Sequence, residues 1–161
     1  MHGITPFLWF TDGAEAAMQF YTSLFPNSKI VTIQRYPEGA TDGPMKGMGG
    51  KVLTGVFELM GRRFMALDGG PVFEPTGAVS FLVECKDQAE IDRYWEALSA
   101  VPEAEQCGWC KDKYGFSWQI VPDMSQWLAG SDTEGAARAT QAMLKMKKIS
   151  IADLEKAYRG E

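Results

Sequence analysis

Histidine is almost absent from this sequence, and cysteine is scarce. The 161 residues contain one histidine, His2, and three cysteines, Cys85, Cys107 and Cys110. Zinc sites and histidine-based catalytic groups need several such side chains at a fixed spacing, which the sequence does not provide. No cluster of carboxylates suggests a metal site with oxygen ligands. We therefore expect no metal ion, no cofactor and no histidine-dependent catalysis.

Long apolar runs and an excess of positive charge are also missing. No apolar run approaches the ~20 residues that span a bilayer, and residues 1–6 lack the basic and then apolar order of a signal peptide. The formal charge of −5 argues against nucleic acid or an anionic membrane as partners. The cysteine count is odd, and nothing marks the chain as secreted. We expect a cytoplasmic protein with reduced thiols.

Glycine motifs for phosphate binding are missing too. Gly47-Met48-Gly49-Gly50 lacks the residue order of a phosphate-binding loop, and no predicted helix follows it. It belongs to segment 37–50, where Gly and Pro predict a long loop. No G-x-G-x-x-G turn follows the first predicted strand. The sequence therefore does not support a Rossmann-type site for a nucleotide or a methyl donor.

What the sequence does contain is one pattern that occurs twice. Each half has a strand-like segment, a polar turn and a helix-like stretch with an aromatic pair. The offset that aligns Phe7 with Phe81 also aligns Phe20 with Tyr94. A long period that occurs only twice indicates a duplicated module rather than a solenoid. We expect the two modules to line a shared cleft.

Periodicity and turn residues predict the elements of each module. We expect one domain over residues 1–161, with module one at about 4–71, module two at about 77–122 and a helical tail at 123–161. The expected strands are 4–10, 29–36, 51–59, 63–67, 79–85, 105–111 and 116–121. Asp12 is the expected N-cap of the first module helix, and the second module helix is expected from about Asp87 to Leu98.

The tail has its own helix signals. Ser131 and Ser150 each open a sequence that resembles a capping box. An apolar stripe along the tail is expected to cover the outer face of the sheet or, alternatively, a partner chain.

Cys107-Gly108-Trp109-Cys110 has the C-x-x-C spacing of redox-active disulfides. Such motifs work at a helix start, whereas this one lies in a predicted strand. In a strand, an odd spacing directs the two side chains to opposite faces, with Cα atoms roughly 10 Å apart. A disulfide needs about 4.4 to 6.8 Å between these atoms. We expect free thiols rather than a redox pair.

The last predicted strand offers a polar face. Alternation places Ser117, Gln119 and Val121 on one side, and Trp118 and Ile120 on the other. The Gln119 amide can donate and accept hydrogen bonds at once, which suits the orientation of a ligand in a concavity. Alternatively, it satisfies backbone groups or faces water.

Several motifs, together with the duplication, resemble one known family. They are segments 4–10, 20–28, 64–71, 107–109 and 112–122. They resemble the PhnB-like branch, often labelled demethylubiquinone methyltransferase-like, of the vicinal-oxygen-chelate (glyoxalase/bleomycin-resistance) superfamily. The resemblance implies an α+β fold of tandem β-α-β-β-β modules whose sheets form half-barrels, with a helical C-terminal tail. It also implies a homodimer.

The resemblance indicates where a metal ion would be bound. Metal-dependent members place ligands at positions that correspond here to about Pro6, Ala66, Ser80 and Gln119. Proline, alanine and serine leave essentially no ligand set for a divalent metal. This departure argues against metal-dependent glyoxalase or dioxygenase chemistry. The sequence also lacks the methyl-donor site that the methyltransferase in the family label would need.

The leading hypothesis is therefore a protein of unassigned specific activity that binds a small organic molecule in an apolar cleft without metal. Such pockets combine apolar and aromatic walls with a few polar groups. The candidate cleft residues are Leu8, Phe10, Met65, Leu67, Ser80, Leu82, Trp109, Ser117 and Gln119.

Two alternatives remain. One is a metal-independent or atypical enzyme, such as a glyoxalase-like lyase or the methyltransferase-like activity. Asp68, Glu84 or Asp112 could then act as acid or base, although no spacing singles one out. The other is a dimeric interaction module whose cleft is filled by its own side chains.

Overall fold

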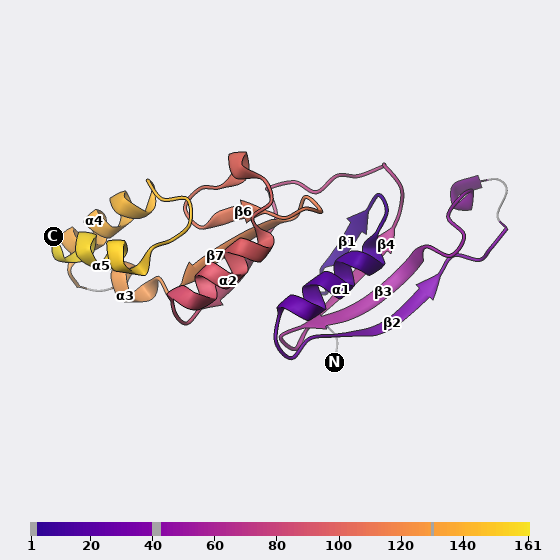
Figure 1. Cartoon of the computed structure of the whole chain (residues 1–161), viewed down its shortest axis with the longest axis horizontal. Helices are drawn as coiled ribbons and strands as arrows, with labels where there is room; N and C mark the ends of the chain where they lie inside the picture. The colour runs from indigo at the N-terminus through magenta and orange to yellow at the C-terminus, as the bar shows by residue number, and fades with distance from the viewer. Residues whose placement is uncertain (1–2, 40–42, 130) are drawn as a thin grey trace. The chain divides into compact units, whose positions relative to one another are not determined.

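Each half of the chain forms a β-sheet with a helix on one of its faces (Figure 1). The computed structural model describes residues 3–39, 43–129 and 131–161. The chain divides into two compact units, Met1–Pro75 and Thr76–Glu161, and this boundary falls in the link predicted between the modules. The predicted α+β class with two modules is confirmed.

The first unit contains a four-stranded sheet in the order β1-β4-β3-β2. Its elements are β1 (Phe7–Phe10), α1 (Ala14–Leu24), β2 (Lys29–Arg35), the 3-10 helix η1 (Gly43–Met45), β3 (Val52–Leu59) and β4 (Arg62–Asp68). β1 runs parallel to β4, and β3 is antiparallel to β2 and β4. His2 and residues 40–42 of the predicted loop lie outside the described residues.

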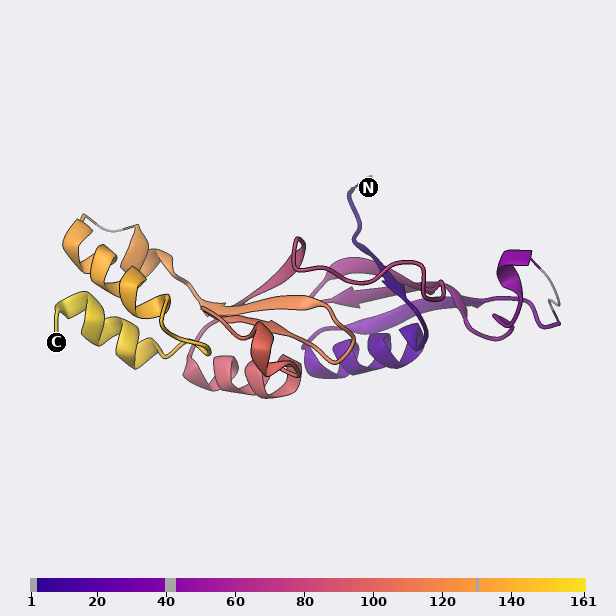
Figure 2. The same cartoon turned by 90° about the horizontal axis from the view of Figure 1, so that it is seen from above.

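Helix α1 covers one side of this sheet (Figure 2). It buries Ala14, Ala17, Met18 and Tyr21, which the helical repeat places on one face. Met18 packs so closely on the sheet that a Cβ built on Gly55 would lie 2.5 Å from its Cε atom. We call the covered side the helix face. The opposite side, which no described helix covers, is the open face.

A buried carboxylate from β4 holds the N-terminus of α1. Asp12 was predicted to cap this helix, but it is exposed, and Gly13 takes the cap position with no side-chain hydrogen bond. Instead Asp68 accepts from the backbone N–H of Ala14 at 2.8 Å and from that of Val52 at 2.9 Å. Negative charge is favourable beside a helix N-terminus. Asp68 therefore ties α1, β3 and β4 together.

The second unit contains a three-stranded sheet in the order β5-β7-β6. Its elements are β5 (Ser80–Cys85), α2 (Gln88–Leu98), the 3-10 helix η2 (Pro102–Ala104), β6 (Trp109–Lys111) and β7 (Ser117–Pro122). β5 is parallel to β7, and β6 is antiparallel to β7. Within the described residues this module is β-α-β-β, one strand short of the predicted repeat. Pro102, which lacks an N–H group, opens η2 where a further strand would run.

Helix α2 packs on its sheet as α1 does on the first. It buries Ile91, Tyr94 and Leu98, and Asp87 caps it by accepting from the Glu90 N–H group at 2.9 Å. Along β7, buried Trp118 and Ile120 alternate with less buried residues. The sheet therefore has a helix face and an open face like the first one.

The tail adds three helices, α3 (Ser125–Leu128), α4 (Thr133–Met143) and α5 (Ile151–Arg159). Ser150 caps α5 as predicted, by accepting from the Asp153 N–H group, whereas α4 is capped by Asp132 rather than by Ser131. α4 and α5 pack against each other. No described helix combines the length and the apolar character that a membrane span requires.

The connection between α4 and α5 binds the turn before β6. Cys107 and Gly108 donate backbone hydrogen bonds to the carbonyl groups of Met146 and Lys147, at 2.9 and 2.7 Å. Ile149 in this connection is fully buried. The tail is thus attached to its own unit at this turn. Of its apolar residues, Ile149 and Leu154 are fully buried, whereas Leu144 is 52% exposed.

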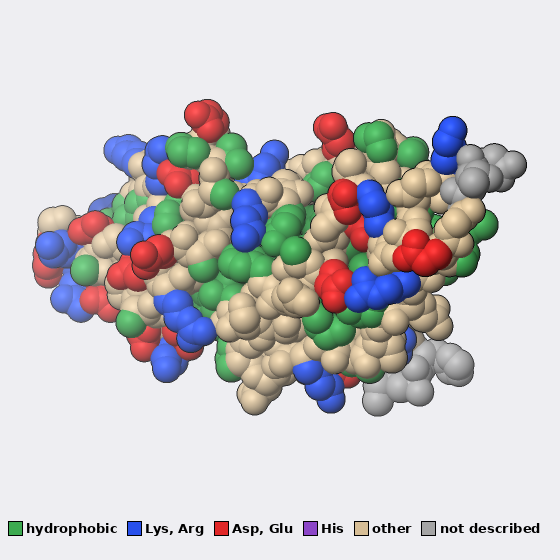
Figure 3. Space-filling view, turned by 45° about the vertical axis from the view of Figure 1, so that its right-hand side comes forward, with side chains coloured by type: hydrophobic (Ala, Val, Ile, Leu, Met, Phe, Trp, Pro, Cys, Tyr) green, Lys and Arg blue, Asp and Glu red, His purple; other side chains and the backbone are tan. Residues whose placement is uncertain are grey.

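Charged side chains of both signs are interspersed on the surface in view (Figure 3). No continuous basic stripe crosses the described residues on this face. The distribution agrees with the low positive charge of the sequence.

Candidate functional site

Five of the nine predicted cleft residues lie on the open face of the second sheet. Strand register brings them into two rows. One row contains Ser80 of β5, Ser117 of β7 and Lys111 of β6, and we call it the serine–lysine row. The other contains Leu82, Gln119 and Trp109, and we call it the glutamine row. Alternation directs all six side chains to one face of the sheet.

The two rows are joined by a side-chain hydrogen bond. The Gln119 amide Nε2 donates to the Ser80 hydroxyl at 2.8 Å. Gln119 is half-buried, and Leu82 beside it is 58% exposed. A fixed amide on a partly apolar face can present its carbonyl oxygen to a ligand donor.

The four candidates from the first module do not share one face. Leu8 and Phe10 are 6% and 4% exposed and lie on the helix face. Met65 and Leu67 are half-buried and lie on the open face, because they alternate with the buried residues of β4. Leu8 and Phe10 therefore belong to the core beneath α1, away from the face that carries Met65 and Leu67.

The four candidates are divided because the offset that relates the two modules in the structure differs by one residue from the offset read from the sequence. The burial pattern aligns Tyr21 with Tyr94 and Met18 with Ile91, one residue away from the offset that the aromatic pairs suggested. A shift of one residue in a strand moves every side chain to the other face. With the corrected offset, Phe10 matches the buried Val83.

The open face of the first sheet is almost entirely apolar where the second carries its polar rows. Register pairs Phe7 with Met65 and Trp9 with Leu67. The Trp9 indole donates to the carbonyl of Gly70 at 2.9 Å, and its ring meets Phe73 edge-on with centroids 5.0 Å apart. The segment after β4 thus folds over Trp9.

The positions that correspond to metal ligands are divided between the two units. Ala66 is fully buried on the helix face, and the Pro6 carbonyl accepts from the Met65 N–H group at 2.9 Å. Ser80 and Gln119 bind each other. Across residues 3–39, 43–129 and 131–161, no three His, Cys, Asp or Glu side chains lie together as a metal would require.

Two of the three candidate acid–base residues have structural roles. Asp68 caps α1, as described above. Asp112 is 1% exposed and accepts from the N–H groups of Tyr114 and Phe116 and from the Trp118 indole, at 2.8 to 3.0 Å. It holds the turn between β6 and β7. Glu84 is exposed at the far end of β5.

The three thiols are free, but only the second half of the C-x-x-C motif, Trp109 and Cys110, lies in a strand, β6. Cys107 has a positive φ of 52° in the turn before β6, and Cys110 is buried on the helix face. Burial raises the pKa of Cys110 to about 12. Burial, with nearby carboxylates, likewise raises the pKa of Cys85 to about 12. Neither buried thiol is therefore ionised near neutral pH, as a nucleophile would need to be.

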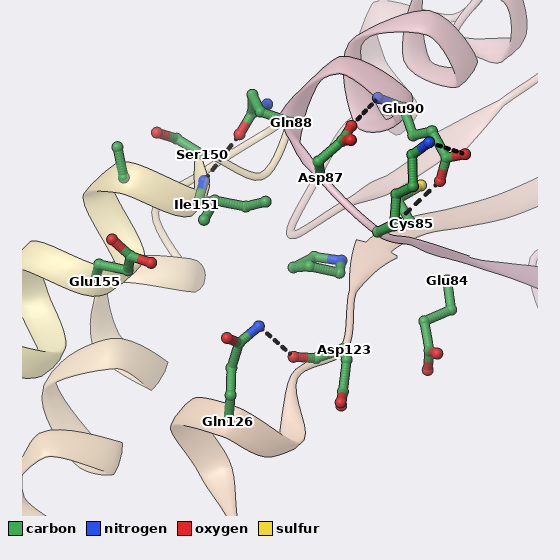
Figure 4. A pocket seen from close by; sticks show the side chains of 13 residues that line it. Glu84, Cys85, Asp87, Gln88, Glu90, Asp123, Gln126, Ser150, Ile151 and Glu155 are labelled. Atoms are coloured by element: carbon green, nitrogen blue, oxygen red, sulfur yellow. Dashed lines mark hydrogen bonds and ion pairs between the residues drawn. The ribbon is translucent and has the colours of Figure 1, made fainter.

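A concavity elsewhere in the same unit has a different lining (Figure 4). It has a volume of about 810 Å³ and lies between the end of β5, the start of α2 and the tail helices. Its acidic residues are Glu84, Asp87, Glu90, Asp123 and Glu155. The sequence did not predict this groove, because the tail supplies half of its wall.

Most polar groups of this groove already have structural partners. Asp87 caps α2, and Glu90 accepts from the backbone N–H of Lys86 at 3.0 Å. Gln88 accepts from the Ile151 N–H group at 2.9 Å and donates to the Ile149 carbonyl, which attaches the tail to α2. The groove is therefore a junction between module two and the tail, and the open face is the better candidate site.

Comparisons with known proteins match the modules and not the tail. A family model described as 3-demethylubiquinone-9 3-methyltransferase matches residues 2–121. Among curated proteins, none matches this chain.

Solved structures show the same coverage. A PhnB protein from Bacillus cereus, named for the same methyltransferase, is 40% identical, with a TM-score of 0.62, and 74% of this chain covers 99% of it. A Staphylococcus aureus protein is 31% identical over 74% of this chain and 95% of its own, with a TM-score of 0.33. A Pseudomonas aeruginosa protein is 18% identical over 76% of this chain and 97% of its own length. Its TM-score is 0.56, and it resembles this chain in fold.

Proposed function

This chain belongs to the PhnB-like family, whose model is described as 3-demethylubiquinone-9 3-methyltransferase, and from that premise we propose that it binds a small organic molecule on the open face of its second sheet, without a metal ion. The observation that carries the proposal is the Gln119–Ser80 hydrogen bond on that face. It fixes an amide beside the apolar side chains of Leu82 and Trp109. A few oriented polar groups on an apolar wall are typical of sites for organic ligands.

A thermal-shift screen tests this proposal. Planar aromatic and polyketide-like compounds are added to the full chain, and a ligand at 100 times its Kd should add about 2.7 kcal/mol of stability. Gln119→Leu should abolish the shift, because the leucine cannot orient a polar ligand group. The same substitution should change the stability of the free protein by only about 1 kcal/mol, since the lost hydrogen bond is half-exposed.

Gln126→Leu is the matched control. Gln126 lies on α3 in the acidic groove, so its loss should leave the shift unchanged. A shift that persists in Gln119→Leu but disappears in Gln126→Leu would move the site to the groove and refute the proposal.

The metal-free part of the proposal has its own measurement. Elemental analysis of the purified protein should find less than stoichiometric Zn²⁺, Ni²⁺ and Mn²⁺. One bound metal ion per chain, with loss of ligand binding after chelation, would contradict it. The support for this part is the residue set itself: of the positions that correspond to metal ligands, Ser80 and Gln119 lie on this face, and neither is a usual ligand of these metals.

Methyl transfer, which the family description names, has less support here. A methyl-donor site of the Rossmann kind needs a free helix N-terminus after the first strand. In the first unit that N-terminus is occupied by the buried Asp68 carboxylate. In the second it is occupied by Asp87, the cap of α2. We therefore do not assign methyl transfer to either module.

We also propose that the chain forms a homodimer. Leu82 on the open face and Val79 just before β5 are 58% and 68% exposed, and exposed apolar side chains that lie together can mark a protein interface. A second copy of the chain could cover them. Sedimentation equilibrium should give twice the monomer mass. A monomer at all concentrations would refute this proposal, and a dimer that binds no compound would favour the interaction module.

A further inference from the structure

The positive charge on the open face of the second sheet has no partner. Lys111 lies in the serine–lysine row opposite Ser117, and it is half-buried. Across the described residues its ammonium group forms no ion pair and no hydrogen bond. Other lysines of this unit, such as Lys147 and Lys148, are paired with carboxylates. Lys111 therefore keeps its charge available on the proposed binding face.

The neighbouring hydroxyl group also lacks a partner among the described residues. Ser117 is 6% exposed, yet its hydroxyl forms no hydrogen bond within the described part of the chain. Gly77 passes beside it, since a Cβ built there would lie 3.9 Å from the Ser117 Oγ atom. The Oγ atom itself is not fully buried, because no fully buried side-chain oxygen or nitrogen of the described residues lacks a hydrogen-bond partner. The Ser117 hydroxyl is therefore accessible on the binding face and can donate a hydrogen bond to a ligand.

The third member of the row, Ser80, can donate a hydrogen bond to a ligand. Ser80 already accepts the hydrogen bond from Gln119, so its own hydroxyl proton remains to be donated. The row therefore offers three donors, one of them charged. The acidic residue of this face, Glu84, lies at the other end of β5, beyond Leu82. The row is complementary to a group that is negatively charged and only accepts hydrogen bonds.

We propose that the serine–lysine row binds the oxyanion of an organic acid, a carboxylate or a phosphate ester, whose apolar body lies along Leu82 and Trp109. Charge-assisted hydrogen bonds from Lys111 and Ser117 hold the anion. The glutamine row holds the rest of the molecule. This inference rests on the proposed function, and it names the class of ligand.

Three matched probes test it on the full chain. They are 2-naphthoate, 2-naphthyl phosphate and the neutral 2-naphthamide, titrated by NMR with the Trp109 indole signal as reporter. At least one acid should bind with a Kd about tenfold lower than that of the amide, because only the acids pair with Lys111. The tighter of the two acids identifies the anion as carboxylate or phosphate.

Substitutions test whether the serine–lysine row causes the preference for the acids over the amide. Lys111→Met should reduce the tenfold preference to about onefold, while Lys111→Arg should keep most of it. Ser117→Ala should weaken the acids more than the amide. Lys113→Met is the control, because Lys113 is exposed in the turn over the Tyr114 ring and should not change the preference. If Lys111→Met fails to fold, the salt dependence of binding replaces this test. The preference for the acids should then fall steeply with added salt in both the unmodified chain and Lys111→Arg.

The outcomes separate this inference from the proposed function. Equal binding of the acids and the amide, with both lost in Gln119→Leu, would overturn the oxyanion site and leave the proposed function intact. A preference for acids that survives Lys111→Met would also overturn the site. No binding of any probe, together with a screen without thermal shifts, would overturn both.

Discussion

The two modules share a scaffold, but their open faces differ at equivalent positions. In the first, Phe7, Trp9, Met65 and Leu67 make an apolar surface. In the second, the register-equivalent residues are Ser80, Leu82, Ser117 and Gln119. The helix faces stay apolar in both. Packing beneath a helix limits substitution to similar apolar residues, whereas an open face can change its chemistry without loss of fold.

Each module also buries one aspartate, but for a different purpose. Asp68 accepts two backbone N–H groups and attaches α1 to its sheet. Asp112 accepts three N–H groups and fixes the β6–β7 turn beside the proposed site. The second module thus uses its buried charge to stabilise the strands that carry the serine–lysine row.

The largest expected effect on stability comes from substituting these two aspartates. Asp112→Ala should lower the free energy of unfolding of the second unit by about 3–5 kcal/mol, because three donors, among them the buried Trp118 indole, lose their acceptor. Asp68→Ala should lower that of the first unit by about 2–4 kcal/mol, since two donors are affected. Urea unfolding is followed with alkylation of Cys110 for the second unit and Trp9 fluorescence for the first. A smaller loss in Asp112→Ala than in Asp68→Ala would contradict the comparison.

The next largest effect on stability is expected from substitutions at two glycines. Gly108 and Gly13 both have positive φ, at 82° and 89°. A Cβ on Gly108 would lie 2.9 Å from Val121 Cγ1 and 3.0 Å from the Ile120 carbonyl, whereas a Cβ on Gly13 would meet nothing within 4 Å. Gly108→Ala should therefore cost about 3 kcal/mol, from strain and overpacking, and Gly13→Ala only about 1 kcal/mol. The same urea experiments measure both. Equal costs would show that the turn before β6 can shift to make room.

The smallest effect is the response to acid. A hydrogen bond from Lys148 lowers the pKa of Asp92, one from Ser99 lowers that of Glu105, and one from Ser125 lowers that of Asp123. In the first unit, a hydrogen bond from Lys51 lowers the pKa of Asp12. Carboxylates with lowered pKa values stabilise the fold above their unfolded pKa, and this stability is lost as pH falls through the folded pKa.

Because three such groups lie in the second unit and one in the first, acidification from pH 5 to pH 3 should destabilise the second unit more. Three of the four carboxylates, those of Asp12, Asp92 and Asp123, are exposed to solvent, so the difference should be modest and should shrink with salt. NMR signals assigned to each unit, followed in urea at both pH values, measure it. Lys148→Gln should reduce the response of the second unit alone. A greater loss in the first unit would contradict the comparison.

Much of the fold follows from local patterns in the sequence. The sequence predicts a helix after the first strand, and alternation in β7 separates Trp118 and Ile120 from Ser117 and Gln119. Both predictions are confirmed, because a helix repeat and a strand repeat depend only on neighbouring residues. The family resemblance, carried by short motifs, is confirmed in the same way.

Features set by contacts between distant residues were not predicted correctly. The one-residue offset between the modules placed Leu8 and Phe10 on the open face, because aligning aromatic pairs says nothing about which of them is buried. Asp68 replaces Asp12 at the start of α1 across a long stretch of chain. The acidic groove exists only where the tail meets α2.

The sequence by itself therefore determined the modules, their helices and strands, and the polar face of β7, since each rests on local periodicity. Only the tertiary structure decided which β1 residues face the open side, which aspartate caps α1, and that Lys111 joins Ser117 and Ser80 in one row. Strand register sets these neighbours. Register is a property of paired strands, and a single strand's sequence does not contain it.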